Sequence, residues 1–383
     1  MCLICASLSQ PLSTAEADAL HAASTVPLQP VYVTGTMSFD SGYTTREIDA
    51  MAGQLTLGYW QSIGAGSRHF AVRPGGVLNV DLSALTAEGQ SLARLALDAW
   101  TEVSGITFNS APDQGATIHI TFDDDQAGAY STSQLSGTSI VSSHVNVSTD
   151  WLASYGTTAD TYSLQTYIHE IGHALGLGHA GDYNGTVRSS QIVYSYDSWQ
   201  ISVMSYIAQS SNRYVDASGA YVLGPMQADI AAIQDLYGSW TRVGIGNTTY
   251  GVGATAGGTH QAIAALLADG TLDRPISFVV MDASGIDTLD LSTDTQRQYI
   301  NLTPGGMTSA YGLLNNILIT LDTMIERVLA GSGDDFILGN LTNNYIAAGA
   351  GADNADGGRG NDTIFGGDGA DTLLGGTGND SIA

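Results

Sequence analysis

One short stretch of the chain spaces three imidazoles, a carboxylate and a glycine as a catalytic metal site requires. Positions four apart on a helix lie one turn apart on nearly the same face, so His169 and His173 can point at one cation. Glu170 is rotated by about 100° from His169 and can reach a water on that metal without being a ligand. Gly176 tolerates positive φ, so the helix can end there and the chain can fold back to bring in His179. Three neutral histidines with an open fourth position predict a catalytic zinc site rather than a closed structural one.

A helix whose histidines share one face by accident is the structural alternative. If each fixed position is about a one-in-twenty event, a chance match somewhere in the chain is about a one-in-ten-thousand occurrence. The zinc interpretation is therefore favoured over the accidental one.

Two helices are expected around these residues. The metal motif predicts one from about Leu164 to Leu175. A second is expected to open with Gly224-Pro225 and to stop near Gly238, because proline in the first turn and glycine after the last are common helix boundaries. Upstream, Thr86 is a candidate N-cap for a further helix whose apolar residues recur at helical spacing.

Strand patterns accompany these helices. The stretches 117–122 and 144–147 alternate polar and apolar residues, as half-buried strands do. His119 and His144 belong to these strands and are interpreted as polar-face residues rather than ligands. The mixture of elements predicts an α+β (mixed α/β) domain over residues 35–240.

The charge balance is strongly acidic. The 383 residues include 37 acidic and 11 basic ones, for a formal charge of −26. Such a chain repels nucleic acid and anionic membranes, and it suits a protein that collects cations. Charged residues are nevertheless only 13% and apolar residues 43%, which is typical of a folded protein. The length allows two domains with separate cores, and no apolar run approaches the roughly 18 residues of a membrane span.

Residues 1–34 are expected to form an N-terminal leader or propeptide, rich in small and polar residues. The segment from Met1 to Leu8 lacks the basic start and the long apolar run of a standard signal peptide. Cys2 and Cys5 are the only cysteines, so no disulfide framework supports the fold. Either a thiolate of this pair caps the zinc and keeps the site latent, or the pair is removed with the leader; the second alternative is favoured.

From residue 331 to the end the sequence repeats every nine residues, in the G-G-x-G-x-D-x-U-x pattern of a calcium-binding parallel β structure. Its acidic position holds Asp335, Asn344, Asp353, Asp362, Asp371 and Asp380, and its inward apolar position holds Ile337, Ile346, Ala355, Ile364, Leu373 and Ile382. With two units per coil, alternate acidic positions line the same edge. Calcium accepts six to eight oxygens and would relieve the repulsion between stacked carboxylates.

The second and third units of this tract are the weakest. In the second, Asn340, Thr342 and Asn344 replace two glycines and the aspartate, and in the third Ala355 takes the inward position. A flexible Gly/Asp linker is the alternative, but a linker would not hold an aliphatic residue in register over successive units. We therefore expect an all-β parallel β-roll domain over residues 241–383.

With these motifs on hand, the chain resembles the serralysins, the secreted bacterial branch of the metzincin metallopeptidases (peptidase family M10B), over about residues 35–383. The residues that match the metzincin zinc signature are His169, Glu170, His173, Gly176 and His179. Ser202-Val203-Met204-Ser205-Tyr206 matches the Met-turn of these enzymes. The resemblance implies that Met204 forms an apolar floor beneath the zinc ligands. It implies that Tyr206 is a weak zinc ligand that swings away to stabilise the oxyanion of the reaction.

The resemblance also implies structural calcium ions besides the single catalytic zinc. Near the domain junction the implied ligands are Arg242, Asp282, Gly285, Asp287 and Glu326. In the RTX repeats they are Gly331, Gly333, Asp335, Gly349, Gly351, Asp353, Gly358, Gly360, Asp362, Gly367, Gly369, Asp371 and Asp380. The expected cofactors are therefore one Zn²⁺ and several Ca²⁺.

Three features depart from the family pattern. Ala180 stands where serralysins usually carry proline, and Met324 replaces an expected threonine near Glu326, which weakens that calcium site. The chain ends in the sixth repeat, whereas the family usually continues into a β-rich segment with a secretion signal. We therefore expect either a truncated C-terminus or a different route of export.

The sequence thus predicts a secreted, zinc-dependent endopeptidase of broad specificity, made as a zymogen. Glu170 would serve as general base and then general acid, and Tyr206 would donate to the oxyanion. An extended substrate would pair with an edge strand near Ala127 to Ser131. The family implies an extracellular bacterial monomer exported by type I secretion, acting on protein or peptide substrates, with a proteinaceous protease inhibitor as a further partner.

Two other functions were weighed against this one. A calcium-binding RTX adhesin or scaffold with a catalytically inactive zinc domain is the alternative that the motifs leave open. A repeat-bearing lipase would need a G-x-S-x-G nucleophile elbow, and the sequence has none.

Overall fold

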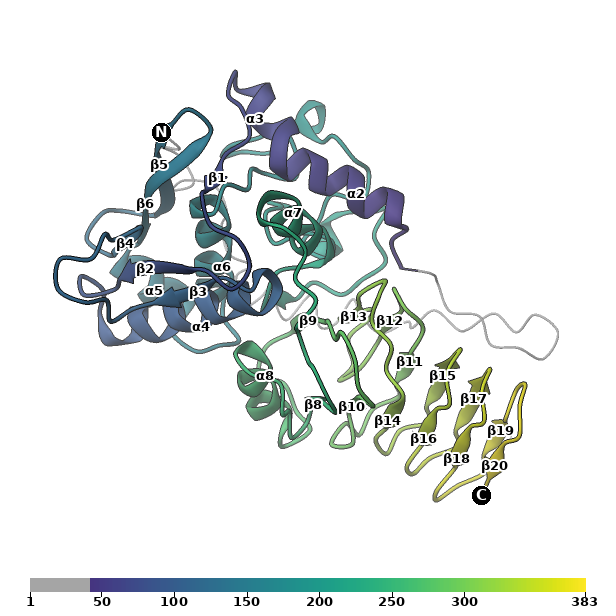
Figure 1. Cartoon of the computed structure of the whole chain (residues 1–383). Coiled ribbons are helices and arrows are strands. Elements are labelled where there is room, and N and C mark those ends of the chain that lie inside the picture. The colour runs from purple at the N-terminus through teal and green to yellow at the C-terminus, as the bar shows by residue number, and fades with distance from the viewer. Residues whose placement is uncertain (1–41) are drawn as a thin grey trace. The chain divides into compact units, whose positions relative to one another are not determined.

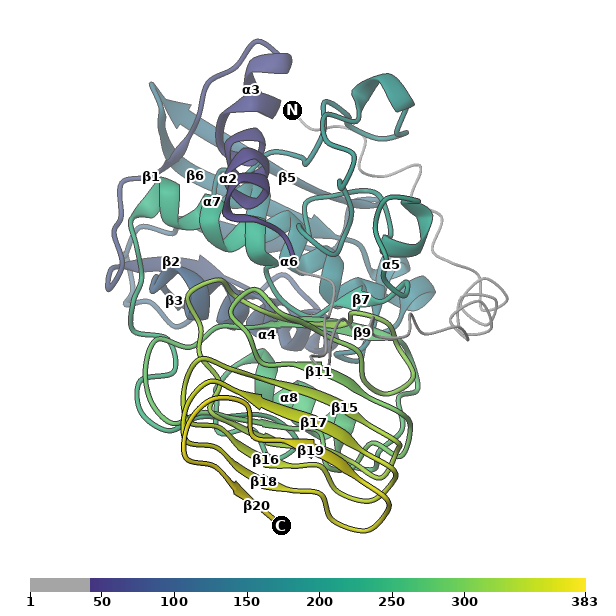
Figure 2. The same ribbon diagram turned by 90° about the vertical axis from the view of Figure 1, so that its right-hand side faces the viewer.

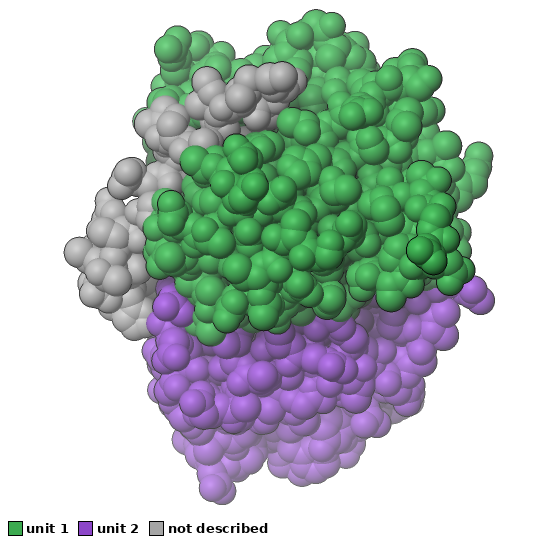
Figure 3. All heavy atoms as spheres, turned by 90° about the vertical axis from the view of Figure 1, so that its left-hand side faces the viewer, with its two compact units in different colours: residues 1–17, 45–215, 221–241 green, residues 18–44, 216–220, 242–383 purple. Residues whose placement is uncertain are grey.

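The computed structural model describes residues 42–383, and the expected leader, residues 1–34 with Cys2 and Cys5, lies outside the described residues. The described chain divides into two compact units, coloured separately in Figure 3. Unit 1 holds Thr45–Val215 and Tyr221–Thr241, and unit 2 holds residues 42–44, Asp216–Ala220 and Arg242–Ala383. No helix in the described part of the chain is long and apolar enough to span a bilayer.

Unit 1 combines helices with one mixed sheet (Figure 1). Its α-helices are α2 (Thr45–Gly53), α3 (Tyr59–Ser62), α4 (Ala87–Ser104), α5 (Thr149–Tyr155), α6 (Tyr162–Ala174) and α7 (Gln227–Tyr237). A π-helical turn covers Gln54–Gly58, and short 3-10 turns cover Ser189–Gln191 and Gln209–Ser211. Its strands are β1 (His69–Phe70), β2 (Val77–Asp81), β3 (Thr107–Asn109), β4 (Ile120–Asp123), β5 (Ala129–Ser136), β6 (Ser139–Val147) and β7 (Tyr221–Val222). This confirms the predicted mixed α/β class.

The sheet of unit 1 has the order β1-β6-β4-β2-β3, with parallel neighbours throughout. β5 runs antiparallel along the other side of β6 and forms an edge of the sheet. The predicted strand over 144–147 lies within β6, whereas the one predicted over 117–122 begins only at Ile120. The edge strand β5 overlaps residues 127–131, the stretch that we expect to pair with substrate.

Local signals fix the helix that supports the metal motif. α4 begins after Thr86, whose hydroxyl accepts a hydrogen bond from Gly89 N at 3.2 Å, as predicted for an N-cap. It ends at Gly105, which has φ 67°. The two helices α4 and α6 pack together, and Trp100 Nε1 donates to the carbonyl of Ile168 at 2.9 Å.

α6 is a core helix, since its residues from Ser163 to Ala174 are all buried. It confirms the helix predicted from Leu164 to Leu175 to within two residues. α7 ends at Gly238 as predicted. However, α7 begins after Met226, so Pro225 precedes the helix instead of lying in its first turn.

Unit 2 is built on two parallel sheets of short strands. One sheet consists of β8 (Thr249–Gly251), β10 (Thr288–Asp290), β14 (Arg327–Leu329), β16 (Tyr345–Ala347), β18 (Thr363–Phe365) and β20 (Ser381–Ile382). The other consists of β11 (Tyr299–Asn301), β15 (Phe336–Asn340), β17 (Asn354–Gly358) and β19 (Thr372–Leu374). Figure 2 shows the successive coils that the two rows of strands make. Unit 2 also contains α8 (Thr259–Leu267), β9 (Ile276–Val280), β12 (Met307–Thr308) and β13 (Ile317–Ile319).

The roll begins well before the nine-residue repeats. Thr248 N donates to Asp287 Oδ1, and Asp287 N donates to Glu326 Oε2, each across 39 residues. From Asn344 onward, equivalent bonds connect residues only 18 apart, as between Asn344 N and Asp362 Oδ1. The coils therefore change from long to short at the start of the repeats. The inward positions Ile337, Ile346, Ala355 and Ile364 are fully buried, while Leu373 is half-buried and Ile382 is 48% exposed.

Two helical glycines give opposite predictions for the same substitution. A Cβ on Gly172 of α6 would lie 2.6 Å from Met204 Sδ and 3.0 Å from the ring of Trp100. Gly172→Ala should therefore lower the free energy of unfolding by about 1–3 kcal/mol through overpacking. Gly53 has no atom within 4 Å of that position, so Gly53→Ala should raise it by up to about 1 kcal/mol. Urea denaturation of the full chain measures both, and a stabilising Gly172→Ala would contradict the close packing of α6 on Met204.

Candidate metal centre

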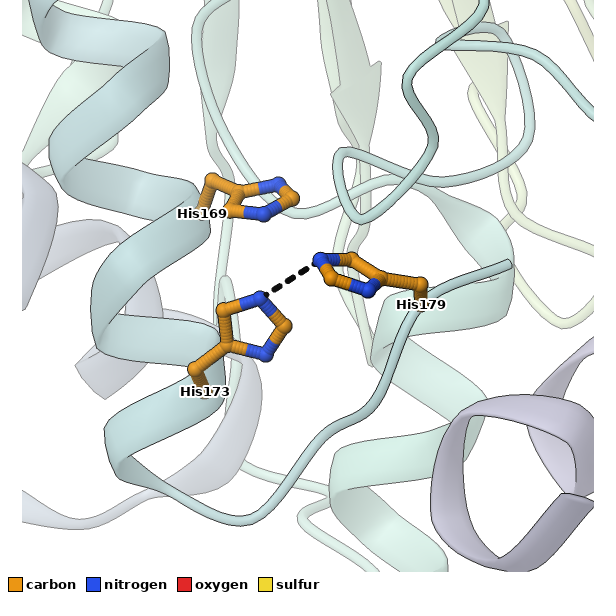
Figure 4. Close-up of side chains that lie close together, drawn as sticks. All are labelled: His169, His173 and His179. Carbon is orange, nitrogen blue, oxygen red and sulfur yellow. Dashed lines mark hydrogen bonds between the residues drawn. The ribbon is translucent and has the colours of Figure 1, made fainter. Parts of the chain in front are cut away.

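Three buried histidine side chains converge in unit 1. His169 and His173 lie one turn apart on α6, and His179 comes from the segment after the helix (Figure 4). One ring nitrogen of each lies within 4.8 Å of the others. Nε2 of His173 is 2.9 Å from Nε2 of His179. Within residues 42–383, no other cluster of three or more His, Cys, Asp or Glu side chains has ligand atoms this close together.

The turn at Gly176 brings His179 back to the helix. Gly176 has φ 110°, a value that favours glycine, and a Cβ at this position would collide with the carbonyl of Arg68. The Gly176 carbonyl accepts a hydrogen bond from Trp60 Nε1 at 2.9 Å. Tyr59 packs edge-on against the ring of His179, with centroids 4.8 Å apart. Two aromatic residues far away in sequence therefore help to place the third histidine.

Backbone carbonyls orient the two helical histidines. His169 Nδ1 donates to the carbonyl of Val203 at 2.9 Å, and His173 Nδ1 donates to that of Leu177 at 2.8 Å. A carbonyl can only accept, so each neutral ring carries its proton on Nδ1 and presents a lone pair on Nε2. Among the described residues, the buried Nε2 of His169 has no hydrogen-bond partner. Such an atom fits a metal ligand.

Burial keeps the three rings neutral. It lowers the pKa of His169 to about 4, and burial together with the nearby His169 lowers the pKa of His173 to about 3. The pKa of His179 is also well below its ordinary value, because of burial and then because of the other two rings. Neutral imidazole is the metal-binding form, and three such nitrogens with room for a further ligand are the donor set of catalytic zinc. Zinc therefore fits these residues.

One buried carboxylate holds the Met-turn. Asp229, fully buried on α7, accepts hydrogen bonds from Ser202 Oγ at 2.6 Å and from Val203 N at 2.7 Å. It also accepts one from Met226 N at 2.8 Å and so caps its own helix. Burial raises the pKa of Asp229 to about 7, and these hydrogen bonds oppose the rise. Because the Val203 carbonyl orients His169, Asp229 supports a predicted zinc ligand through the turn.

Glu170 lies at the edge of a cavity of about 240 Å³ that His169 and Tyr206 also line. The side chain of Glu170 is buried, with 1% of its surface exposed. Aromatic residues form much of the remaining wall, namely Trp151, Tyr162 and Trp199. Ala129, at the start of the edge strand β5, lines the cavity as well. The geometry places an acid or base, a tyrosine and one histidine of the cluster around one space.

Tyr206 packs against aromatic rings that a buried carboxylate, Asp197, helps to hold. Its ring lies 4.5 Å from that of His179 and stacks on Tyr183, with centroids 5.1 Å apart. The Tyr183 hydroxyl donates to the Asp197 carboxylate at 2.9 Å, and Ser205 Oγ donates to it at 2.6 Å. Burial raises the pKa of Asp197 to about 6, against the effect of these two bonds. No local motif reveals this network, because its members are separated along the chain.

The expected calcium ligands near residue 282 gather in unit 2. Asp282 and Asp287 are buried, and a Cβ on Gly285 would lie 2.8 Å from Asp287 Oδ1. Asp287 N donates to Glu326 Oε2 at 2.9 Å. Burial, with the charge of Asp282, raises the pKa of Asp287 to about 7 against a hydrogen bond from the backbone. Arg242 is exposed. Two buried aspartates whose charges interact, with Glu326 bonded to the backbone of one of them, supply the acidic oxygens that the implied calcium site requires.

The repeat aspartates stack along the two edges of the roll. Asp335 N donates to Asp353 Oδ1 at 2.8 Å, and Asp353 N donates to Asp371 Oδ1 at 3.1 Å. On the other edge Asp362 N donates to Asp380 Oδ1 at 3.0 Å. In the described structure the second carboxylate oxygens of Asp335, Asp353 and Asp362 are buried without a hydrogen-bond partner. These oxygens fit calcium. The predicted glycine ligands with positive φ are Gly349, Gly351, Gly358, Gly360, Gly367 and Gly369, whereas Gly331 and Gly333 lack it.

Family models match three successive parts of the chain. The matrixin model of peptidase family M10 matches residues 78–200, and the model for the C-terminal part of M10 serralysins matches residues 241–344. The model for RTX calcium-binding nonapeptide repeats matches residues 348–382. These matches agree with the zinc motif, the region near the expected junction calcium and the stacked repeats.

Several bacterial metalloproteases are similar to this chain. Metallopeptidase AprA of Pseudomonas marginalis is 36% identical over 276 residues, which cover 69% of this chain and 56% of AprA. Serralysin C of Dickeya chrysanthemi is 35% identical over 260 residues, which cover 65% of this chain and 52% of the relative. Metalloprotease AprA of Pseudomonas entomophila (strain L48) is 35% identical over 266 residues, which cover 66% of this chain and 53% of the relative. The chain thus spans about half the length of these relatives.

Removing the charge of Asp229 should loosen the Met-turn. In Asp229→Asn the bonds from Val203 N and Met226 N lose their charged acceptor, and an NH2 group replaces the oxygen that accepts from Ser202 Oγ, so the free energy of unfolding should fall by about 1–3 kcal/mol. Zinc affinity should fall by about 10- to 100-fold, because the Val203 carbonyl would no longer hold His169 firmly. Urea denaturation and competition with a zinc chelator measure the two effects. Asp235→Asn, on an exposed position of α7, is the matched control. Equal behaviour of the two variants would rule out this role.

Without calcium, the contribution of two repeat aspartates to stability should fall as the pH rises. Burial raises the pKa of Asp335 to about 8 and that of Asp353 to about 6, each partly offset by a backbone hydrogen bond. These folded carboxyls therefore keep protons that the unfolded chain releases near pH 4, and their contribution to the free energy of unfolding decreases from about pH 4 to pH 8. With calcium the decrease should vanish, because the ion binds the deprotonated form. The variant Asp335→Asn, Asp353→Asn lacks both titrating groups, so the difference in unfolding free energy between wild type and variant, measured with urea in chelator at pH 5 and 8, isolates their effect. A difference that favours wild type more at pH 8 than at pH 5 would contradict this prediction.

Proposed function

We propose that this chain is a secreted zinc-dependent endopeptidase. The proposal is supported by the serralysin-type order of its segments, which are a matrixin segment, a serralysin C-terminal segment and RTX repeats. The observation that carries the proposal is the cavity lined by Glu170, Tyr206 and His169, the last of which belongs to the cluster of three histidines. Zinc held by His169, His173 and His179 would lower the pKa of a bound water toward about 7 and polarise the scissile carbonyl.

Two residues that line the cavity have different roles: Glu170 transfers protons, and Tyr206 stabilises the negative charge that forms on the substrate. Glu170 takes the proton of the attacking water and later delivers it to the leaving amine. Its burial among apolar and aromatic groups excludes bulk water from this exchange. Tyr206 donates its hydroxyl proton in a hydrogen bond to the oxyanion that forms at the substrate carbonyl. Asp197 supports the backbone of Tyr206 through Tyr183, whose hydroxyl donates to Asp197 and accepts from Tyr206 N at 3.4 Å.

The walls of the cavity favour protein substrates with a large apolar side chain next to the scissile bond. Tyr162 lies 6.0 Å from Trp151 and 5.8 Å from Trp199, measured between ring centroids, and all three residues line the cavity. An extended peptide can add to the edge strand β5, which begins at the cavity residue Ala129. Main-chain pairing of this kind accepts many sequences, and broad specificity follows.

Calcium-binding repeats and an acidic surface suit an extracellular setting. Extracellular modules commonly bind calcium with millimolar to submillimolar affinity, and such concentrations are met outside the cell. The formal charge of −26 keeps the chain soluble once the ions are bound. We propose export from a bacterium by type I secretion, and action as a monomer.

The decisive variant is Glu170→Ala, compared with wild type on casein with and without a zinc chelator. The full chain, loaded with zinc and calcium, should keep one zinc per chain in the variant, because all three histidines remain. Hydrolysis should fall by about 10²- to 10⁴-fold, because the general base is lost. Glu88→Ala, an exposed glutamate on α4, is the control and should match wild type.

Two results would overturn the proposal. Retained hydrolysis in Glu170→Ala would exclude the mechanism. Wild-type protein that holds zinc and leaves casein intact would favour a calcium-binding scaffold with an inactive zinc domain.

A further inference from the structure

The repeat unit that begins at Asn340 differs in chemistry from those that follow it. Asparagine stands at its first position and at the position where other units carry aspartate. The side chains of Asn340 and Asn344 are both buried, each with 2% of its surface exposed. Buried side-chain amides need hydrogen-bond partners in the same way that buried carboxylates need partners or cations.

In an aspartate unit, one carboxylate oxygen is left for a cation. Asp362 Oδ1 accepts a hydrogen bond from Asn344 N at 2.7 Å, and Asp353 Oδ1 accepts one from Asp335 N at 2.8 Å. The other oxygen of both aspartates is buried and has no hydrogen-bond partner in the described structure. A Cβ on Gly357, at the start of the turn, would lie 2.5 Å from Asp362 Oδ2, so this oxygen faces the turn of its own unit.

In the asparagine unit, the side-chain amide hydrogens are donated to carbonyls of the preceding coil. Asn344 Nδ2 donates to the carbonyls of Ile325 at 3.2 Å and Glu326 at 3.3 Å. Asn340 Nδ2 donates to the same Ile325 carbonyl at 2.8 Å and to that of Leu302 at 3.1 Å. Two neutral amides therefore satisfy three inward-facing carbonyl oxygens, the type of ligand that calcium accepts in this kind of turn.

The orientation of each amide is fixed by its partners. Asn344 Oδ1 accepts from the backbone N–H of Asn340 at 2.8 Å, and Asn340 Oδ1 accepts from Thr342 N at 2.9 Å. An N–H group can only donate, and the carbonyls opposite the Nδ2 atoms can only accept. A Cβ on Gly339 would lie 2.8 Å from Asn344 Oδ1, the place that Asp362 Oδ2 takes relative to Gly357. The asparagines thus fill the geometry of an aspartate unit with all their polar atoms partnered.

The other edge of the roll begins in the same way. Gln298 is fully buried and takes the place of the aspartate before Asp335, because Gln298 N donates to Asp335 Oδ1 at 2.7 Å. Its Nε2 donates to the carbonyl of Leu291 and to Asp294 Oδ2, both at 3.1 Å, and its Oε1 accepts from Gly331 N at 3.2 Å. On each edge of the roll an amide side chain therefore precedes the first aspartate of the repeats, Gln298 before Asp335 and Asn344 before Asp362.

We propose that the turn from Asn340 to Asn344 binds no calcium, and that its two side-chain amides fasten the first short coil to the preceding turn in place of the ion. This amide seam leaves β16 attached to β14 when calcium is removed, while the coils after residue 349 come apart. The seam gives the calcium-dependent coils a folded end on which to stack, since each coil in a solenoid is stabilised mainly by its neighbour. The inference concerns metal stoichiometry and folding, and it does not depend on peptidase activity.

Calcium counting on the full chain tests the seam. The triple variant Asn340→Gly, Thr342→Gly, Asn344→Asp restores the residue types of a regular unit, and it should bind one more calcium ion per chain than wild type in native mass spectrometry. Asn343→Asp makes the same charge change one residue away on an exposed side chain, and it should bind the wild-type number. An unchanged count in the triple variant, or an extra ion in Asn343→Asp, would overturn the proposal.

Hydrogen exchange of the wild-type chain supplies a second test that needs no variant to fold. In chelator, amides in residues 340–347 should exchange at least tenfold more slowly than those in residues 353–374, and added calcium should protect both segments. In chelator, Asn344→Asp should lose the protection of residues 340–347. Equal loss of protection in both wild-type segments on calcium removal would overturn the assignment.

Discussion

A carboxylate that is removed from water must be surrounded by hydrogen-bond donors or by a cation. The candidate site of unit 1 depends on how the buried carboxylate of Asp229 meets this requirement. The donors that Asp229 needs come from the Met-turn at Ser202 and Val203 and from the start of its own helix. Satisfying the charge therefore fixes the turn, and the turn presents the carbonyl that orients His169. A stability requirement and a metal-binding requirement are met by the same hydrogen bonds.

The aspartates of unit 2 face the same requirement and meet only half of it with protein groups. Asp335 and Asp353 each receive backbone N–H donors on one oxygen, and their other oxygen is buried without a partner in the described structure. Asp229, by contrast, has protein donors on both oxygens. This difference separates carboxylates that complete a fold by themselves from carboxylates that require an ion. It explains why we expect calcium to control the repeats and not the Met-turn.

The sequence predicted the parts of the structure whose information is local. The histidine spacing, the glycine after the helix and the Thr86 cap lie within a few residues of the elements they specify, and the structure reproduces the helices they indicate. Asp197 and its partner Tyr183 are 14 residues apart, and Asp229 is 26 residues from Val203, so only the folded chain joins them. The coils before residue 331 show no repeat in the sequence for a related reason. Their spacing of 39 residues hides a periodicity that is plain once it shortens to 18.

The amide seam from Asn340 to Asn344 lies where the separation between bonded residues of successive coils shortens to 18. The energetics of short coils explain why the two features occur together. A nine-residue unit buries about one aliphatic side chain, worth about 1.5–3 kcal/mol, whereas ordering its backbone costs at least about 1 kcal/mol for each residue. Long coils can offset this cost with additional core, as the buried strand β9 does with Ile276 and Phe278. Short coils have no such core, so polar interactions at their turns must supply the difference. The first short coil does this on one edge with neutral amides against the carbonyls of a long coil. On its other edge, at Asp335, and in the later coils, carboxylates need an ion.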